Sequence, residues 1–233
     1  MKKILGCVKR AQSEFNMIEE GDVVAVGLSG GKDSMTLLKA LNLYRNFAPV
    51  HYELKAITVD MGFEGFDTKK LEAFCRENEA EFIPESTRLG PLIFEERQEK
   101  GPCGMCSRMR RGILNRVCEE NGVTKLALGH HGDDLLETFF LSLVYEGRVN
   151  AFKAVTPFER TPVVQIRPLI YAEETDVIDA ALRHRIPIVK NPCPASGVTK
   201  RQEMKDAIDD LVEKTGQPRS RMIRALCRSD LVR

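Results

Sequence analysis

The sequence predicts an α/β fold, a doubly wound and mostly parallel sheet with helices on both faces. Two observations lead to this prediction. Apolar, β-branched runs of strand length alternate along the chain with segments whose apolar residues recur at helical spacing. The strand runs are nearly continuous in apolar residues, which is typical of strands buried on both faces. The chain has 233 residues, enough for one large domain or one domain with a small appendage.

The elements follow one another in a strand–helix rhythm that favours parallel strands joined by crossover helices. Strands are expected at residues 22–28, 52–60, 81–86, 124–129 and 163–169. Helices are expected at residues 4–18, 34–47, 68–80, 107–122, 133–145, 173–185 and 199–214. Residues 146–162 are expected to form a connecting loop. We divide the chain into an N-terminal helix (1–20), a main domain (21–215) that carries the candidate site and the clustered cysteines, and a basic C-terminal tail (216–233), either a short helix or partly disordered.

The composition is that of a soluble globular protein, with 42% hydrophobic and 30% charged residues. No apolar run approaches the roughly 20 residues that a membrane-spanning helix needs. The basic start has neither the long apolar core nor the cleavage site of a secretory signal. We therefore expect a cytoplasmic protein without membrane contact, and a homodimer is compatible with the sequence. In that compartment the seven cysteines would be thiols, so clustered ones suggest a metal or catalysis.

A glycine loop, SGGKDS at residues 29–34, follows the first strand and precedes a helix. Glycines let backbone N–H groups converge on a phosphate, and the helix start adds partial positive charge. Lys32 supplies a full charge, whereas a plain glycine turn capped by Asp33 or Ser34 would leave that lysine idle. The loop is not a Walker loop, because Val26 stands where the first glycine should be and Asp33 follows the lysine.

The segment LALGHHGDD puts two histidines and two aspartates at another strand end. In doubly wound sheets ligands bind at the carboxyl ends of the strands, so this segment and the glycine loop should meet. Asp134 and Glu137 have the spacing of an N-cap and its return partner, which leaves Asp133 unused. Because Mg²⁺ prefers carboxylate and phosphate oxygens, we expect Asp133 to act beside a nucleotide. His130 and His131 either contact the ligand or close the turn.

Three cysteines lie in segments that proline and glycine make stiff. Cys103 and Cys106 form a C-x-x-C pair before a predicted helix, and Cys193 stands between two prolines. Three thiolates on two such loops suit a soft metal. A structural zinc site needs a fourth ligand, and the sequence offers no convincing one; His184 is no more than a possible candidate. A redox C-x-x-C leaves Cys193 unexplained, whereas an iron–sulfur cluster held by three cysteines would leave one iron open.

SGGKDS resembles the pyrophosphate loop of the PP-loop ATPases, which share a doubly wound fold of the adenine nucleotide alpha hydrolase type. Over most of residues 1–215 the chain resembles the tRNA 2-thiocytidine synthetase family, through SGGKDS, C-x-x-C followed by SRMRRGIL, LALGHHGDD and the third cysteine. The resemblance implies an adenylating enzyme that activates a pyrimidine carbonyl oxygen of tRNA. Sulfur from a [4Fe–4S] cluster would then replace that oxygen, with sulfide or a cysteine desulfurase as donor.

The resemblance also implies the roles of individual residues. Lys32 and Asp133 would be catalytic. Cys103, Cys106 and Cys193 would hold the cluster. ATP with Mg²⁺ would be bound by Ser29, Gly30, Gly31, Lys32, Asp33, Ser34, Val59, Asp60, Met61, Gly129, His130 and Asp134.

Several alternatives stay open at this point. One is a PP-loop ligase with a nitrogen nucleophile, in which the cysteines bind structural zinc. Others are thiolation of a different RNA base or a small molecule, and a sulfur-carrier or redox protein that binds a nucleotide for regulation. The residues do not choose among modified bases, sulfur donors or oligomeric states.

Two basic segments stand out although the net charge is only +1. Residues 100–116 hold five bases and no acid, and residues 217–233 hold five arginines against one acid. Arg108 and Arg111 share a helix face that could contact phosphate of RNA or ATP. The tail either meets an anionic partner or is a solvated surface. Cys227 lies among its arginines, which leaves a persulfide role open. Buried, structural roles are expected for Cys7, Cys75 and Cys118.

Overall fold

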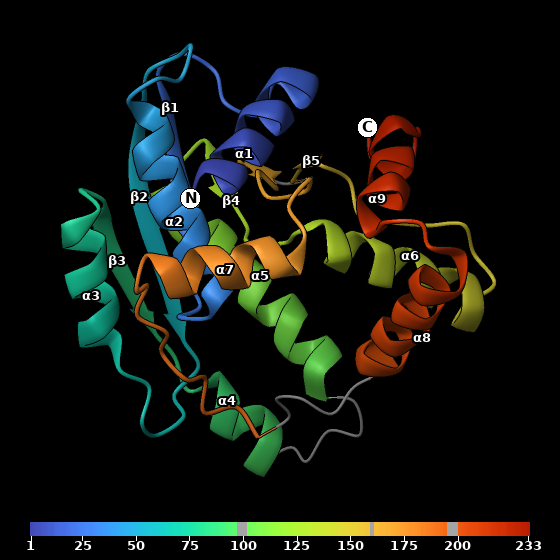
Figure 1. Cartoon of the computed structure of the whole chain (residues 1–233). Helices are drawn as coiled ribbons and strands as arrows, with labels where there is room; N and C mark the ends of the chain where they lie inside the picture. The colour runs from blue at the N-terminus through green and yellow to red at the C-terminus, as the bar shows by residue number, and fades with distance from the viewer. Residues whose placement is uncertain (97–101, 159–160, 195–199) are drawn as a thin grey trace.

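The computed structural model describes residues 1–96, 102–158, 161–194 and 200–233 (Figure 1). A six-stranded sheet runs through it in the order β3-β2-β1-β4-β6-β5. All neighbouring strands are parallel except β5 and β6. The strands are β1 Asp22–Gly27, β2 Tyr52–Asp60, β3 Glu81–Ser86, β4 Lys125–Ala127, β5 Val155–Pro157 and β6 Val164–Ile166. The predicted doubly wound, mostly parallel sheet is therefore confirmed, with the short edge strand β5 falling in the expected loop.

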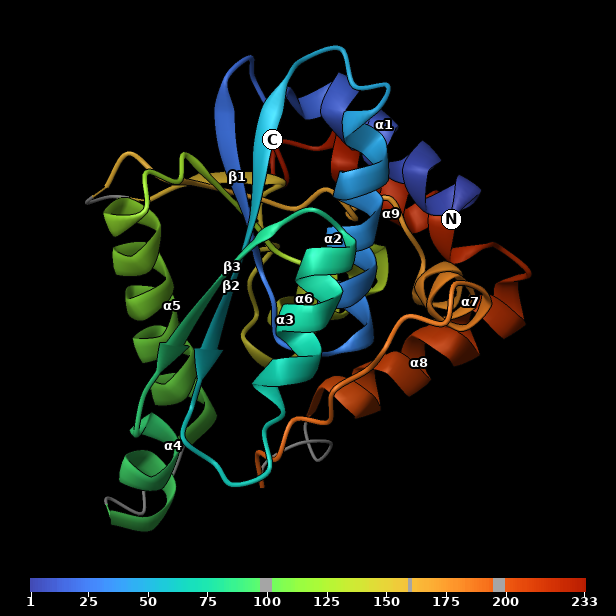
Figure 2. The same ribbon diagram turned by 90° about the vertical axis from the view of Figure 1, so that its left-hand side faces the viewer.

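Helices cover both faces of this sheet. Figure 2 shows α5 on one face and α2 and α3 on the other. None of the described helices is long and apolar enough to cross a lipid bilayer. The helices are α1 Lys2–Phe15, α2 Lys32–Arg45, α3 Thr68–Glu77, α4 Leu89–Pro91, a π-helical turn Leu92–Glu96, α5 Pro102–Glu120, α6 Gly132–Tyr145, α7 Glu174–Arg183, α8 Lys200–Thr215 and α9 Arg219–Arg228.

Each face of the sheet has its own hydrophobic core, and the alternation of side chains along a strand feeds both. Val24 and Val26 of β1 belong to the larger core, which α1, α2 and α6 also enter. Ala25 between them belongs to the smaller core beneath α5. Successive strand side chains point to opposite faces, so one apolar run serves both layers. This explains why β1 is apolar throughout rather than alternating.

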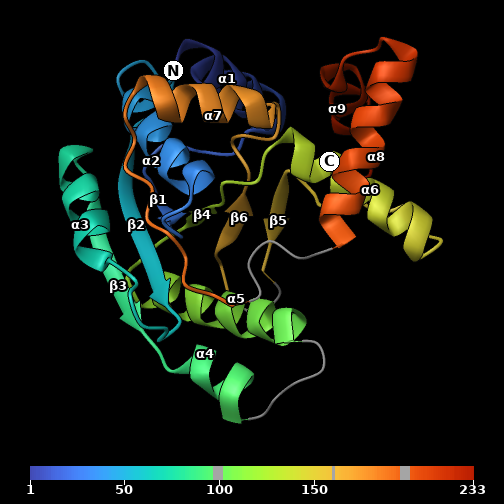
Figure 3. The ribbon, with the colours of Figure 1, turned by 60° about the horizontal axis from the view of Figure 1, so that its bottom comes forward.

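The two terminal helices pack against the rest of the fold. α1 lies against α2 and α7, and α9 lies against α6. Of the two expectations for the C-terminal tail, a short helix or partial disorder, the helix is observed. Ile223 and Cys227 bury the inner face of α9, and the main-chain N–H of Ala154 donates to the Val232 carbonyl at 2.8 Å. Figure 3 shows α8 and α9 together beside α6 at one end of the molecule.

The expectation that Cys103 and Cys106 lie in a loop is wrong. Helix α5 already begins at Pro102, so both cysteines are in its first two turns. Proline is tolerated at the first helical position because that N–H has no intrahelical acceptor anyway. Three residues apart in a helix, the two cysteines share one face.

The sheet changes winding direction between β1 and β4, and the loops that leave these two strands are in contact. A β-carbon added to Gly129, after β4, would lie 2.9 Å from the backbone of both Asp33 and Ser34, after β1. The Thr58 hydroxyl donates to the Leu28 carbonyl at 2.8 Å and anchors the β1 loop to β2. The switch point is where doubly wound sheets open a crevice for ligands.

The contact at Gly129 makes that position intolerant of a side chain. Gly129→Ala should lower the free energy of unfolding by about 1–3 kcal/mol, because the methyl group meets rigid backbone rather than a movable side chain. The measurement is the midpoint of urea-induced unfolding. Gly112→Ala in α5 is the matched control, since its added β-carbon has nothing within 4 Å. It should raise stability by roughly 0.5–1 kcal/mol. Equal midpoints for the two variants would contradict the loop contact.

Candidate functional site

A cavity of about 400 Å³ opens at the carboxyl ends of β1, β2 and β4. Its walls come from the loop after β1, the end of β2, the first half of α5, β6 and the loop after β4. The residues around 191 border it as well. The predicted nucleotide-site residues that line it are Ser29, Asp33, Ser34, Val59, Asp60, Met61, Gly129, His130 and Asp134. Gly30, Gly31 and Lys32 belong to the same loop and helix start but are not among the lining residues. Most of the predicted site is thus brought together in one place.

The glycine loop is held in shape by its own serines. Ser34 donates to the Gly31 carbonyl at 3.1 Å and accepts the main-chain N–H of Ser29 at 3.1 Å. Gly30 has a φ of +83°, a left-handed conformation that favours glycine. Its carbonyl accepts the N–H of Val189 at 2.9 Å. Gly31 is the N-cap of α2, so the free N–H groups at the helix start lie in a loop that needs no rearrangement to receive an anion.

Lys32 is held by two carboxylates at the edge of this loop. Its Nζ lies 3.2 Å from Asp33 Oδ1 and 3.0 Å from Glu174 Oε1. Burial disfavours the charged lysine, but these two carboxylates outweigh it and raise the pKa of Lys32. Burial also acts against ionised Glu174, yet hydrogen bonds from Lys205 and Lys32 lower the pKa of Glu174 to about 2. Lys32 is therefore positively charged, and its long side chain lies next to the free N–H groups at the start of α2.

The helix after β4, expected at residues 133–145, begins one residue earlier, at Gly132. His131 is the N-cap of α6: its ring Nδ1 accepts the N–H of Asp134 at 3.4 Å. The Asp134 carboxylate accepts the N–H of His131 at 3.0 Å and completes a capping box. The prediction of Asp134 as N-cap is wrong, because histidine can supply the cap acceptor and the carboxylate then serves as the return partner.

His130 lines the cavity next to this cap. Its ring lies 5.4 Å from the ring of Phe152. Burial lowers the pKa of His130 to about 4, although Asp134 pulls in the opposite direction. The imidazole is therefore neutral at pH 7, and its Nδ1 is buried without a hydrogen-bond partner among the described residues. A neutral ring can accept or donate a hydrogen bond to a ligand in the cavity.

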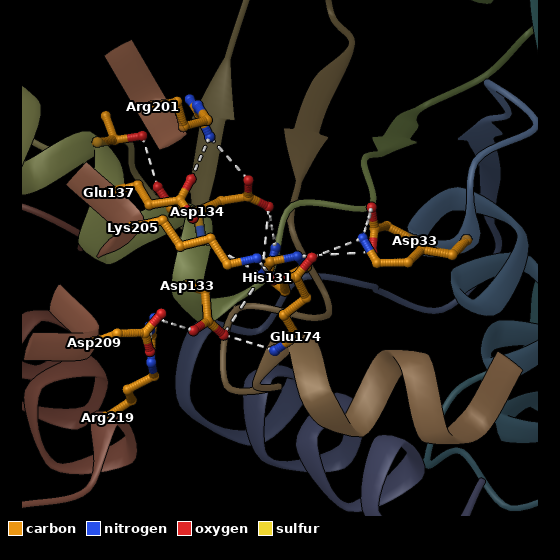
Figure 4. Close-up of polar contacts among 12 residues, drawn as sticks. Asp33, His131, Asp133, Asp134, Glu137, Glu174, Arg201, Lys205, Asp209 and Arg219 are labelled. Atoms are coloured by element: carbon orange, nitrogen blue, oxygen red, sulfur yellow. Dashed lines mark hydrogen bonds and ion pairs between the residues drawn. The ribbon is translucent and has the colours of Figure 1, made fainter. Parts of the chain in front are cut away.

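Asp133 does not line the cavity, and both of its oxygens are engaged (Figure 4). It is only 3% exposed. Oδ2 accepts the N–H of Glu174 at 2.6 Å, and Oδ1 accepts a hydrogen bond from Arg219 at 2.7 Å. This placement gives no support to Asp133 as a metal ligand. Of the two adjacent aspartates, Asp134 is the one that lines the cavity. Sequence reasoning missed Arg219, because nothing in a run of arginines indicates that one of them points inward.

Two further cations from the C-terminal helices reach the acids of this region (Figure 4). Arg201 of α8 lies 2.9 Å from Asp134 Oδ1 and 3.3 Å from Glu137 Oε2. Lys205, one turn later, lies 2.5 Å from Glu174. Together with Arg219 they bring three positive charges to the acids around the β4 loop. The nucleotide end of the cavity is therefore tied to α8 and α9 by ion pairs.

The opposite wall of the cavity is basic. Arg110 and Arg111 of α5 line it together with Arg167 after β6. Arg167 is 6% exposed and forms no ion pair with a described residue. It donates to the Lys153 carbonyl at 2.5 Å, and its guanidinium lies 4.8 Å from the Phe152 ring centroid. Burial, with Arg111 nearby, lowers the pKa of Arg167 to about 10, so the group stays charged at pH 7.

The predicted cluster cysteines are not among the residues that line the cavity, but neighbours from both of their segments are part of its wall. Cys106 is buried and accepts a hydrogen bond from Arg110 at 3.4 Å, Cys103 is exposed, and Cys193 is half-buried. In the described parts of the chain, no three or more His, Cys, Asp or Glu side chains are arranged to hold a metal ion. The thiols thus do not form a closed ligand set here. Their soft donor chemistry nevertheless fits an iron–sulfur cluster. Cavity-lining neighbours of these cysteines are Ser107, Asn191 and Pro192.

The remaining cysteines are structural. Cys227 is fully buried, and burial raises the pKa of its thiol to about 11. A thiol that is protonated at pH 7 and out of reach of solvent is a poor nucleophile, so the structure gives no support to a persulfide role for Cys227. Burial likewise raises the pKa of Cys75 and of Cys118 to about 12. The predicted burial of Cys75 and Cys118 is confirmed, whereas Cys7 is only half-buried and packs against the edge of the larger core.

Comparison with known proteins places this site in a family. A PP-loop domain model matches residues 7–209. The tRNA-cytidine(32) 2-sulfurtransferase of Geobacter metallireducens is 37% identical over 228 residues, covering 97% of this chain and 89% of the relative. That of Syntrophotalea carbinolica is 41% identical over 229 residues, covering 97% and 87%.

Solved structures give the same picture. The U34-tRNA thiolase NcsA from Methanococcus maripaludis, determined with its [4Fe–4S] cluster, matches with a TM-score of 0.77 and 28% identity, covering 98% of this chain and 79% of that one. The NH3-dependent NAD synthetase from Campylobacter jejuni shares the fold at 15% identity and a TM-score of 0.52, covering 96% and 91%. The chain therefore belongs to the PP-loop domain family, in the branch formed by the tRNA-cytidine(32) 2-sulfurtransferases that it matches.

Proposed function

We propose that this protein is an ATP-dependent tRNA sulfurtransferase that converts a cytidine to 2-thiocytidine. The observation that carries the proposal is the shared cavity, which the glycine loop, Asp134 and both cysteine segments border. A single cavity can hold the activated base between the nucleotide and the sulfur source. The names of the relatives, which specify cytidine 32, support this substrate. We place the reaction in the cytoplasm, with sulfide or a cysteine desulfurase as the donor.

The first step activates the base. The cytidine O2 attacks the α-phosphorus of ATP, the bond from that phosphorus to the bridging oxygen breaks, and pyrophosphate leaves. The N–H groups at the start of α2 hold the pyrophosphate portion. Lys32 moves from Glu174 to the phosphates and stabilises the charge that develops on them. Asp134 at the cavity wall is positioned to hold Mg²⁺ once Arg201 releases it.

The second step replaces oxygen by sulfur. A hydrosulfide adds to C2, the C2–O bond breaks, AMP carries the oxygen away, and loss of the sulfur-bound proton leaves a C2 thiocarbonyl. Cys103, Cys106 and Cys193 are the residues that would hold a [4Fe–4S] cluster. With three protein ligands, such a cluster supplies one iron with an open coordination position for sulfur. Arg110, which contacts the Cys106 sulfur, and Arg111 line the wall between the cysteines and the nucleotide.

The function is tested by anaerobic purification followed by incubation with ATP, sulfide and bulk tRNA. We expect iron in the purified protein, AMP release, and 2-thiocytidine among the nucleosides identified by mass spectrometry. Zinc without iron would instead favour a ligase with a nitrogen nucleophile. An intact cluster with no thionucleoside would overturn the tRNA assignment.

Removal of the loop lysine should separate the two halves of the site. Lys32→Ala should lower the rate of AMP release by roughly 10²–10³-fold, because a charge directed at the phosphates in the transition state is lost. The cluster absorbance should be unchanged, because Lys32 contacts no cysteine. The control is Lys39→Ala, a lysine in the same helix but beyond the loop. A Lys32 variant that loses its cluster would contradict the division into two sites.

Removal of a cluster cysteine should have the opposite pattern. Cys193→Ala should abolish thiolation and the visible absorbance of the cluster, while AMP formation from ATP is at least partly retained. Quantified iron, absorbance and AMP are the three measurements. Cys118→Ala is the control, because that thiol is buried beneath α5 on the sheet and should leave the iron content unchanged. Full iron content in the Cys193 variant would remove Cys193 from the ligand set.

The two adjacent aspartates should fail in different ways. Asp134→Asn should raise the Mg²⁺ concentration needed for AMP release, with little loss of stability. Asp133→Asn should lower the free energy of unfolding by about 1–3 kcal/mol, because the Glu174 N–H and Arg219 lose a buried ionised acceptor and Arg219 keeps only Asp209 as a charged partner. Urea unfolding and a Mg²⁺ titration of AMP release distinguish the two. A Mg²⁺ defect confined to the Asp133 variant would restore it as the metal ligand.

A further inference from the structure

Helix α9 carries three arginines that the site does not use. Its inner face places Arg219 on Asp133 and buries Ile223. Arg221, Arg224 and Arg228 are exposed instead, and they line a shallow hollow together with Ala225. Successive helical residues are about 100° apart, so the three arginines fall within roughly 60° of one another on the outer face.

These arginines have no acidic partners among the described residues. Arg221 donates to the side chain of Gln217 at 2.6 Å, and Arg224 donates to the Ser220 carbonyl at 3.1 Å. Arg228 appears in no ion pair of the described chain. Some exposed cations on other helices are paired within their own helix, as Arg183 is with Asp179. α9 contains no Asp or Glu, so its outer face is a stripe of one sign rather than a mixed, solvated surface.

We propose that this arginine stripe is the surface on which the phosphate backbone of tRNA docks, an inference that rests on the proposed function. The stripe runs about 10 Å from Arg221 to Arg228, at 1.5 Å per residue. A nucleic-acid strand places a phosphate about every 3.4 Å along its axis, so the stripe spans roughly three phosphates. Ala225, which lies between the arginines, has only a methyl group and would not obstruct the sugar–phosphate backbone. Arginine pairs well with phosphate through its planar fork.

The position of α9 makes the stripe useful to the reaction. Arg219, two residues before the stripe, is bound to Asp133, and Asp133 is followed by the cavity residue Asp134. A tRNA docked on the outer face would therefore be held by the same helix that contacts the loop bearing Asp134. Contacts to phosphate position a nucleic acid without reading its sequence, which leaves selection of the cytidine to the cavity.

The test is equilibrium binding of tRNA to the full chain over a series of salt concentrations. The variant combines Arg221→Ala, Arg224→Ala and Arg228→Ala. Three lost phosphate contacts should reduce the slope of log K against log salt by roughly 2–3 and weaken binding roughly 10- to 100-fold. ATP binding and cluster absorbance should be unchanged. A second variant with lysine at the three positions should recover most of the slope, because lysine keeps the charge.

The matched control removes the same charge from another helix. Lys69→Ala, Lys70→Ala and Arg76→Ala change three exposed cations of α3, and tRNA binding should stay as in the unaltered chain. Equal losses in the α3 and α9 variants would overturn the docking surface, because net charge alone would then explain them. Unaltered binding by the α9 variant would overturn it as well. A parent chain that binds no tRNA would overturn the proposed function and the docking surface together.

Discussion

The arrangement of the site depends on the buried carboxylate of Asp133, which connects three segments of the chain. One oxygen accepts the first N–H of α7 through Glu174, and the other accepts Arg219 at the start of α9. The loop after β4, the helix that partners Lys32 and the C-terminal helix thus meet at a single side chain. A buried charge is tolerated only when it is fully paired, so loss of any partner would disturb all three segments at once. This is why a residue outside the cavity can govern its geometry.

The charges around the cavity are divided between two walls. Asp33, Asp60 and Asp134 lie toward the nucleotide loops, and Arg110, Arg111 and Arg167 lie toward α5 and β6. The acidic wall would repel a triphosphate unless a divalent cation came with it, which agrees with a Mg²⁺-bound nucleotide. The basic wall contains a buried guanidinium, that of Arg167, which has no carboxylate partner among the residues the structure describes. An anionic nucleotide between the two walls would supply the negative charge that the guanidinium of Arg167 lacks.

The cysteine segments and the nucleotide end are linked through the chain itself. Helix α8 starts seven residues after Cys193, and its Arg201 and Lys205 reach Asp134 and Glu174. The same two acids, with Lys32, respond to a bound nucleotide in the proposed reaction. In the described part of the chain, Cys193 and the other two cysteines are not assembled into a closed ligand set.

The sequence by itself determined the sheet, the glycine loop, and the cavity residues from Ser29 to Asp134, because periodicity and strand ends depend only on local pattern. It also determined the departure from a Walker loop through Val26 and Asp33. Local pattern could not tell Asp133 from Asp134, because which acid faces the cavity depends on an arginine 86 residues away. It could not show that Cys227 is buried, or that Arg219 points inward while its neighbours point out. Those outcomes rest on packing between distant segments, and only the tertiary structure decides them.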